Sequence, residues 1–262
     1  MLKRVSFILL CSLTVHAQDS TKKPSDKETA QQRARAVIER SIAAMGGDRF
    51  RQVREIQSKG HFFLFKDGQT AGLAKYIDYT RLPDKSRNQT GEGKNKEIAI
   101  FDLSANKGWH QEGKSIIKEA TPDEVRQFRQ TVRHAWENLL RGRLDEPGMT
   151  FFYYGSEDIT GKGEVEAVEM IDAENDSVLF YCDLKTHLPT RMEYTSVDRR
   201  GEKHKEATEF YNWHLVQGVM TPHRQDNFSD GQSSSQLFID EITYNPKPAL
   251  SDALFSKPVP EK

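Results

Sequence analysis

Most of this chain alternates apolar and polar residues with a period of two, and turn signals interrupt the alternation at short intervals. The clearest case runs from Gly60 to Phe65, turns at Lys66-Asp67-Gly68 and returns from Ala71 to Leu82. Residues two apart share one face of a strand, so each segment has one face to bury. No segment alternates strands with helices as a parallel sheet requires. We therefore expect a mainly β chain of about eleven antiparallel strands.

The remaining predicted strands follow the same pattern on both sides of one long helical segment. They are Glu97–Phe101, Gly108–Gln111, Ser115–Lys118, Thr150–Tyr154, Glu164–Ile171, Ser177–Asp183, Pro189–Val197, Lys205–Trp213, Met220–Phe228 and Gln232–Tyr244.

Two segments have helical rather than strand periodicity. The first opens at Ser25-Asp26-Lys27-Glu28, which has capping-box spacing, and ends at Gly46-Gly47. The second opens at Thr121-Pro122-Asp123-Glu124, the strongest helix start in the chain, and we expect it to continue unbroken to Arg141 and to end at Gly142. Each helix has a single apolar stripe. Their apolar positions are Ala34, Val37, Ile38, Ile42 and Met45 in the first, and Val125, Phe128, Val132, Ala135, Trp136, Leu139 and Leu140 in the second.

These elements predict an α+β fold that is mainly β: a strongly curved antiparallel sheet forming a half-open barrel, covered by the N-terminal helix and the central amphipathic helix. The hydrophobic content of 36% is low, which suits a thin sheet with one solvated face. We assign residues 31–262 to one such domain and residues 18–30 to a disordered polar leader.

The first residues have the pattern of a secretory signal peptide. Lys3 and Arg4 precede an apolar run, and Ala17 supplies the small residue before a cleavage site, so we expect residues 1–17 to be removed and the protein to work in the periplasm. Lipidation at Cys11 is the alternative, disfavoured because the bulky Leu10 precedes it.

Charge and motifs exclude several function classes. The formal net charge falls from −1 to −3 when Lys3 and Arg4 are lost, which argues against nucleic acid as a partner. Cys182 then remains as a lone cysteine in an apolar strand, typical of a core residue. The chain lacks the zinc-protease, nucleophile-elbow and phosphate-loop motifs, and we expect no enzyme activity, cofactor or metal.

One loose cluster keeps an enzyme of unfamiliar type as an alternative. His214 and His223 lie where adjacent strands would bring them together, and Asp226 is close in sequence.

Aromatic residues are the main functional signal. A curved sheet has one concave face, and if the second helix covers it, the space between is an apolar pocket suited to acyl chains, with the helix as a movable cover. The residues that we predict to line this pocket are Phe63, Phe65, Phe101, Trp109, Phe128, Trp136, Leu139, Phe152, Phe180 and Trp213.

The order of several short motifs resembles bacterial outer-membrane lipoprotein-sorting proteins of the LolA/LolB/LppX type, from about Ala34 to Pro258. The motifs are Ala44-Met45-Gly46-Gly47, Arg81–Arg87, Phe101-Asp102 with Gly108-Trp109, Gly155–Gly161, Tyr181–Arg191, Asn245 and Leu254–Pro258. The resemblance implies a half-open barrel with helices over its mouth. It also implies periplasmic handling of lipids or of the acyl chains of lipoproteins.

Two functions follow from these observations. The first is a monomeric carrier of lipid or acylated lipoprotein, which would exchange cargo with an envelope transporter or an outer-membrane acceptor. The alternative is a non-catalytic interaction module of the same fold, in which the chain's own side chains fill the cavity.

Overall fold

The computed structural model describes residues 26–159, 161 and 163–260. The predicted signal peptide, the alternative lipidation site at Cys11 and most of the predicted leader lie outside these residues. Helix α1 (Asp26–Ala44) begins inside the range 18–30 that we assigned to the leader, so this boundary was placed too late. The capping-box spacing was the better guide to where the helix starts.

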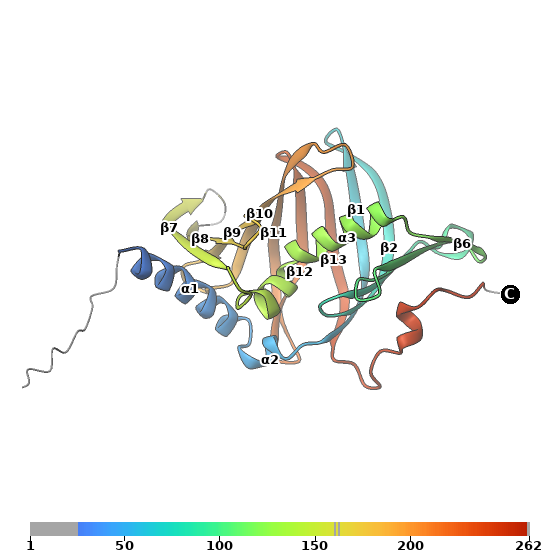
Figure 1. The fold of residues 1–262 in the computed structure, drawn as a ribbon, viewed down its shortest axis with the longest axis horizontal. Coiled ribbons are helices and arrows are strands. Elements are labelled where there is room, and N and C mark those ends of the chain that lie inside the picture. Colours follow the sequence, from blue (N-terminus) through green and yellow to red (C-terminus); the bar gives the residue numbers. More distant parts are fainter. Residues whose placement is uncertain (1–25, 160, 162, 261–262) are drawn as a thin grey trace, which may run out of the picture.

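The strands of the described residues form one antiparallel sheet, as the alternation predicts, but the sheet has thirteen strands where we expected about eleven (Figure 1). The strands are β1 (Glu55–Lys66), β2 (Gln69–Arg81), β3 (Lys85–Thr90), β4 (Glu97–Asp102), β5 (Lys107–Glu112), β6 (Ile116–Glu119), β7 (Thr150–Ile159), β8 (Gly163–Ile171), β9 (Ser177–Asp183), β10 (Pro189–Val197), β11 (Lys203–Val216), β12 (Val219–Ser229) and β13 (Gln232–Tyr244).

The strand order decides where the helices must lie. It runs β6-β5-β4-β3-β2-β1-β13-β12-β11-β10-β9-β8-β7, so β6 and β7 are the two edges and β1 pairs with β13 in the middle. In Figure 1, β6 and β7 lie at opposite ends of the molecule, and the sheet curves around helix α3 (Pro122–His134). The sheet is therefore open, and the segment between β6 and β7 crosses its concave face.

The predicted hairpin between β1 and β2 has the expected turn. Asp67 and Gly68 both have positive φ, 52° and 74°, as a two-residue turn of type I′ requires.

Strand β3 is absent from our sequence prediction. It reads Lys-Ser-Arg-Asn-Gln-Thr, with no apolar residue to reveal an alternation, and all six residues are half-buried. Its strand conformation comes from pairing with β2 on one side and β4 on the other.

The central helix starts as predicted but does not continue to Arg141. The Thr121 side chain and Glu124 form the complete capping box. Ala135 then takes φ −60° and ψ 122°, which ends α3, and the chain continues through the short helix α4 (Trp136–Asn138) and the π-helical turn η2 (Leu139–Arg143). The prediction that Gly142 ends the helix was wrong, because Gly142 lies inside η2.

The break at Ala135 separates two hydrophobic clusters. The smaller cluster contains Phe101 and Val125, with Phe128 of α3 stacked on Phe101 at 4.2 Å between ring centroids. The larger cluster joins α1, the short helix α2 (Asp48–Arg51), α4 and η2 to strands β7–β12, and it also includes Ile56 of β1 and Tyr244 of β13. The predicted stripe of α1 is confirmed as part of it, because its apolar residues Ala34, Val37, Ile38, Ile42 and Met45 are all buried.

A membrane-spanning helix would have to be longer and more apolar than any helix among the described residues.

A substitution at Phe180 of β9 tests whether the larger cluster is the main core of the protein. Its side chain is 0% exposed, so Phe180→Ala should lower the free energy of unfolding by about 3–5 kcal/mol, the usual cost of an empty aromatic site in a core. Urea denaturation followed by circular dichroism measures the change. Phe152→Ala on β7, where the side chain is 39% exposed, is the matched control and should cost less than about 1 kcal/mol. Equal losses in the two variants would contradict this assignment of the core.

Candidate functional site

A cavity of about 360 Å³ lies between the central helical segment and the concave face of the sheet. Its floor comes from the middle strands β1, β2, β3, β12 and β13, and its roof from α3 and α4. The apolar lining residues are Ile56, Phe62, Leu82, Pro83, Phe128, Val132, Ala135, Leu237, Ile239 and Ile242. The polar lining residues are Ser58, Tyr76, Asp78, Thr80, Lys85, Ser86, Asn88, Thr131, Glu137, Asn138 and Gln225.

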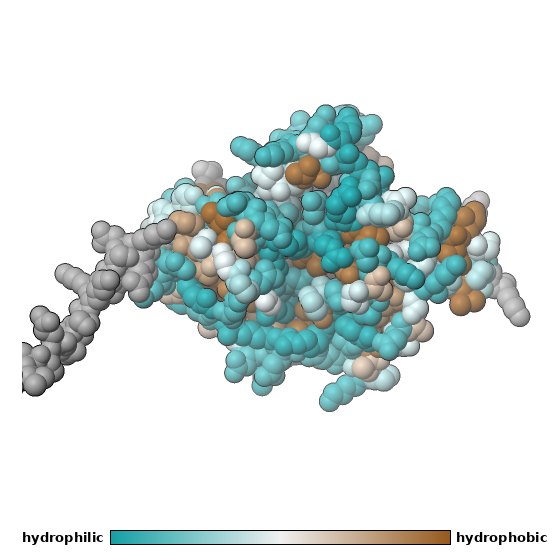
Figure 2. All heavy atoms as spheres, viewed as in Figure 1, coloured by the Kyte–Doolittle hydropathy of each residue, from teal (hydrophilic) through white to brown (hydrophobic). Residues whose placement is uncertain are grey.

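The outer surface over this region is mixed. Figure 2 shows a largely hydrophilic face with hydrophobic residues gathered near its middle, where Figure 1 places α3. A larger hollow of about 470 Å³ near the β6 edge is lined mainly by charged and polar residues and is not suited to an apolar ligand.

The alternation of side chains along each strand decides which residues form the floor of the cavity. Tyr76, Asp78 and Thr80 are two residues apart on β2, so they share the concave face, and Ser58 is paired with Asp78 on β1. A bulge at Gly60 adjusts the register between β1 and β13. A Cβ atom on Gly60 would lie 1.9 Å from the carbonyl oxygen of Phe238 and 3.0 Å from the Tyr76 ring, so only glycine fits there.

The roof of the cavity depends on the break in the helix after α3. It places Glu137 and Asn138 over the cavity in place of another turn of α3. The Asn138 amide donates hydrogen bonds to the carbonyl oxygens of Val132 (3.1 Å) and Pro83 (3.2 Å), which joins the end of α3 to the segment that follows β2. Arg143 donates to the carbonyl oxygen of Arg133 at 2.7 Å. The side chains of Asn138 and Arg143 thus donate hydrogen bonds to carbonyl oxygens at the end of α3, which have no partner within the helix.

Two carboxyl groups face this cavity. Burial raises the pKa of Asp78 from 3.8 to about 6, although the side chains of Thr80 (Oγ1, 3.1 Å) and Asn88 donate hydrogen bonds to it. Burial also raises the pKa of Glu137. The charge of Arg141 and a backbone hydrogen bond oppose this effect, and the charge of Asp78 adds a smaller contribution to it. In the described part of the chain, no Lys, Arg or His nitrogen lies within 4.0 Å of either carboxylate. Both groups therefore favour the protonated form more than exposed carboxyl groups do.

The two nearest cations have other contacts, although Nη1 and Nη2 of Arg141 are buried without a hydrogen-bond partner among the described residues. Lys85 forms an ion pair with Asp102 at 2.7 Å. The Arg141 guanidinium lies 4.1 Å from the centre of the Phe50 ring and donates from Nε to the Phe50 carbonyl oxygen at 2.9 Å. Burial lowers the pKa of Arg141, while the charge of Glu137 opposes that effect.

The cavity also has unpartnered polar atoms. Among the described residues, the Tyr76 hydroxyl and the Asn138 Oδ1 are buried without a hydrogen-bond partner. Tyr76 is 5% exposed and Asn138 is 7% exposed, so these atoms are shielded from bulk solvent. A buried polar atom without a partner is costly, and a ligand that supplies the missing hydrogen bond would remove that cost.

The sequence-predicted pocket residues occupy several different places. Phe128 lines the cavity, and Phe101 stacks behind it. Trp136, Leu139 and Phe180 are buried in the larger cluster, and Trp213 packs against it. Contact between these core residues and a ligand stays a prediction.

The other four predicted pocket residues lie near the sheet surface. Phe63 is on β1 next to Phe62 and so points to the opposite face, where its ring contacts Phe238. Phe65 and Trp109 are half-buried, and Phe152 is exposed. Sequence reasoning did not single out the polar lining of Asp78, Glu137 and Asn138. The one available signal was that Tyr76 and Asp78 are two residues apart on a predicted strand and therefore share a face.

The alternative histidine cluster forms only in part. His214 and His223 do meet, with 4.7 Å between ring centroids, and both burial and His214 lower the pKa of His223. Asp226 is bound instead by Arg224, at 2.8 and 2.6 Å, and by Gln236. The three groups therefore do not form an acid–base triad.

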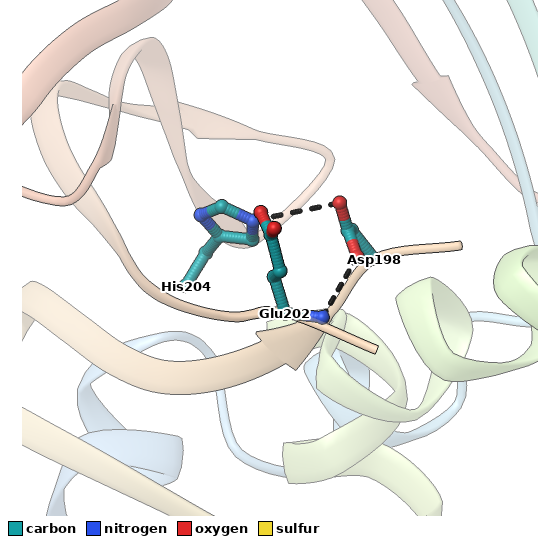
Figure 3. Close-up of side chains that lie close together, drawn as sticks. All are labelled: Asp198, Glu202 and His204. Atoms are coloured by element: carbon teal, nitrogen blue, oxygen red, sulfur yellow. Dashed lines mark hydrogen bonds and ion pairs between the residues drawn. The ribbon is translucent and has the colours of Figure 1, made fainter. Parts of the chain in front are cut away.

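Asp198, Glu202 and His204 gather in the turn between β10 and β11 (Figure 3). Asp198 accepts hydrogen bonds from the backbone nitrogens of Arg200 (2.8 Å) and Glu202 (2.9 Å), and His204 Nδ1 lies 2.8 Å from Asp230. These contacts shape the hairpin, and they account for the cluster without a metal.

Cys182 is buried, and burial raises the pKa of its thiol to about 12, so it is not a nucleophile.

Solved structures that match most of the chain include two that align with a TM-score above 0.5. A LolA superfamily protein from Nitrosomonas europaea aligns with a TM-score of 0.54 and 13% identity over 86% of this chain and 97% of its own. The chain has a LolA-like fold. A domain described as an outer membrane lipoprotein-sorting protein, from Vibrio parahaemolyticus, aligns with a TM-score of 0.52 and 12% identity over 87% of this chain and 97% of its own. No family model matches the sequence, and no curated protein matches it either.

The raised pKa of Asp78 predicts a pH-dependent stability. The folded protein binds this proton more tightly than the unfolded chain, so the resulting stability is complete below about pH 4 and is lost as the pH rises through about 6. Asp78→Asn should therefore be more stable than wild type by about 1–3 kcal/mol at about pH 7.5 and equal to it near pH 4. Urea denaturation at both pH values measures this difference.

Asp158→Asn, at an exposed position of β7, is the control and should show no such pH-dependent gain. A constant difference between Asp78→Asn and wild type across the pH range would refute the raised pKa.

Proposed function

We propose that this protein is an exported carrier that binds lipid or lipoprotein acyl chains in the cavity beneath α3, without chemical catalysis. The observation that carries the proposal is a cavity of about 360 Å³, lined by apolar residues from both the sheet and the central helix. The LolA-like fold is consistent with such a cargo. The sequence-predicted signal peptide supports a periplasmic location.

The energetics of the cavity suit reversible binding. Each methylene group moved from water into an apolar site contributes roughly 0.8 kcal/mol, so a single chain of eight to ten carbons supplies micromolar affinity. The volume is at the lower end of the range for small-molecule pockets, which favours one chain over several. Such a carrier would work as a monomer and exchange cargo with an envelope transporter or an outer-membrane acceptor.

The alternative of a docking module rests on a cavity filled by the chain's own side chains. The open cavity beneath α3 favours the carrier instead, because the lining leaves space that apolar side chains would otherwise occupy.

Native mass spectrometry of protein purified gently from a bacterial periplasm tests the proposal. We expect an added mass that extraction identifies as a phospholipid or an acylated peptide. Protein that carries no added mass and binds no acyl probe would refute the carrier function.

A cavity-filling variant locates the site. Leu237→Trp on β13 adds bulk to the cavity wall and should weaken binding of a fluorescent acyl probe by at least about tenfold, because the indole takes the place of several methylene groups. Leu215→Trp is the control, since Leu215 is 70% exposed on β11 and lies outside the cavity lining. Equal probe affinity in the two variants would place the acyl site elsewhere.

A further inference from the structure

Three of the polar groups in the cavity bear on what it can bind: two carboxylates, which accept hydrogen bonds when ionised, and one amide oxygen without a donor among the described residues. Asp78 and Glu137 contribute carboxylates from opposite sides, one on β2 in the floor and one on α4 in the roof. Asn138 contributes the free Oδ1, because its amide nitrogen already donates to Val132 and Pro83. A pure hydrocarbon ligand would leave the Asn138 Oδ1 without a donor, and it would leave Asp78 with only the neutral donors Thr80 and Asn88.

The charges around the cavity leave room for one more cation. Lys85 is neutralised by Asp102, at 2.7 Å. Arg141 attracts Glu137 but lies against the Phe50 ring, and the described residues contain no cation within ion-pair distance of Asp78. Other titratable groups near this region include Tyr76, whose pKa is raised by burial and also by the charge of Asp240, and Tyr244, whose hydroxyl is 2.8 Å from Thr221. Asp78 is therefore the carboxylate without a counter-charge.

From this arrangement we infer that the cavity selects a single-chain amphiphile whose polar end carries a protonated amine, held between Asp78 and Glu137. The apolar chain lies along Leu237, Ile239 and Val132, which line the same space. The ammonium group donates hydrogen bonds to the two carboxylates and to Asn138 Oδ1, with the Tyr76 hydroxyl close by. This inference rests on the proposed function, because it names the cargo of the same cavity.

The selectivity follows from electrostatics in a shielded site. A charge-assisted hydrogen bond to a buried carboxylate is stronger than a neutral one, and an anionic head group would be repelled. A fatty acid would bring a third carboxyl group to Asp78 and Glu137. A neutral alcohol of the same chain length shares the apolar contacts and lacks the charge, so it separates the two contributions.

Calorimetric titration below the micelle concentration tests the inference with three probes of equal chain length: dodecylamine, dodecanol and laurate. At about pH 7.5 we expect dodecylamine to bind at least about tenfold more tightly than dodecanol, and laurate to bind more weakly than dodecanol. Binding of dodecanol with no preference for the amine would overturn the inference and leave the carrier function intact. Binding of none of the three would overturn both.

Isosteric variants assign the preference to the two carboxyl groups. The double variant Asp78→Asn with Glu137→Gln keeps the shape of the cavity, so it should bind dodecanol as wild type does and lose the amine preference. Glu241→Gln, at an exposed residue of β13 whose partner is Lys59, is the control and should keep it. Retention of the preference in the double variant would overturn the inference.

Two natural classes of amphiphile combine an acyl chain with an amine, and the same titration separates them. Lysophosphatidylethanolamine carries the amine on a lipid head group, and an S-palmitoylated cysteinyl peptide carries it at a free amino terminus. Tighter binding of either compound than of its N-acetylated form supports the inference and identifies the source. Equal binding of both amines and both acetylated forms contradicts it.

Discussion

One covalent connection determines the shape of this protein, because the segment from Ala120 to Met149 leaves one edge strand of the sheet and enters the other. Twelve strand spacings of about 4.8 Å make the sheet roughly 58 Å across, whereas the 13 residues of α3 extend only about 20 Å. A single helix of this length cannot cover the whole concave face. The core consequently divides into a small cluster beside β4 and β5 and a large one beside β7–β12, and the cavity lies between them.

The polar groups in this gap give it a chemical character that the apolar lining alone would not have. Most buried carboxyl groups in proteins have a cationic partner, because an unpaired charge is costly in a shielded site. Asp78 is hydrogen-bonded only by neutral donors, Thr80 and Asn88, and Glu137 is held near it by the break after α3. In the proposed complex, the ammonium group of the ligand supplies the cation that Asp78 lacks among the described residues.

Much of the fold could be predicted from the sequence, and the exceptions have physical causes. Alternation located most strands, and the capping box at Thr121 located the start of the central helix to the residue. The helix end was wrong because the apolar stripe continues through Leu139, and only the tertiary packing shows that it serves two clusters. The cavity lining was harder still. An aromatic residue such as Phe180 has the same signature in a core as in a pocket, and Asp78 became a candidate only once its neighbours were known.

The pairing of β1 with β13 joins residues that are far apart in the chain, for example Ile56 and Tyr244. Every other strand pair in the sheet joins neighbours in sequence, so hairpins on each side can form early and independently. The central ladder closes the loop from Ile56 to Tyr244 and so carries the largest loop-closure cost of any strand pair, and we expect it to form late in folding. Because β1 and β13 both contribute to the cavity floor, the binding site comes into existence only with that step. A partly folded chain thus has no access to cargo, and bound cargo in turn stabilises the completed fold by mass action.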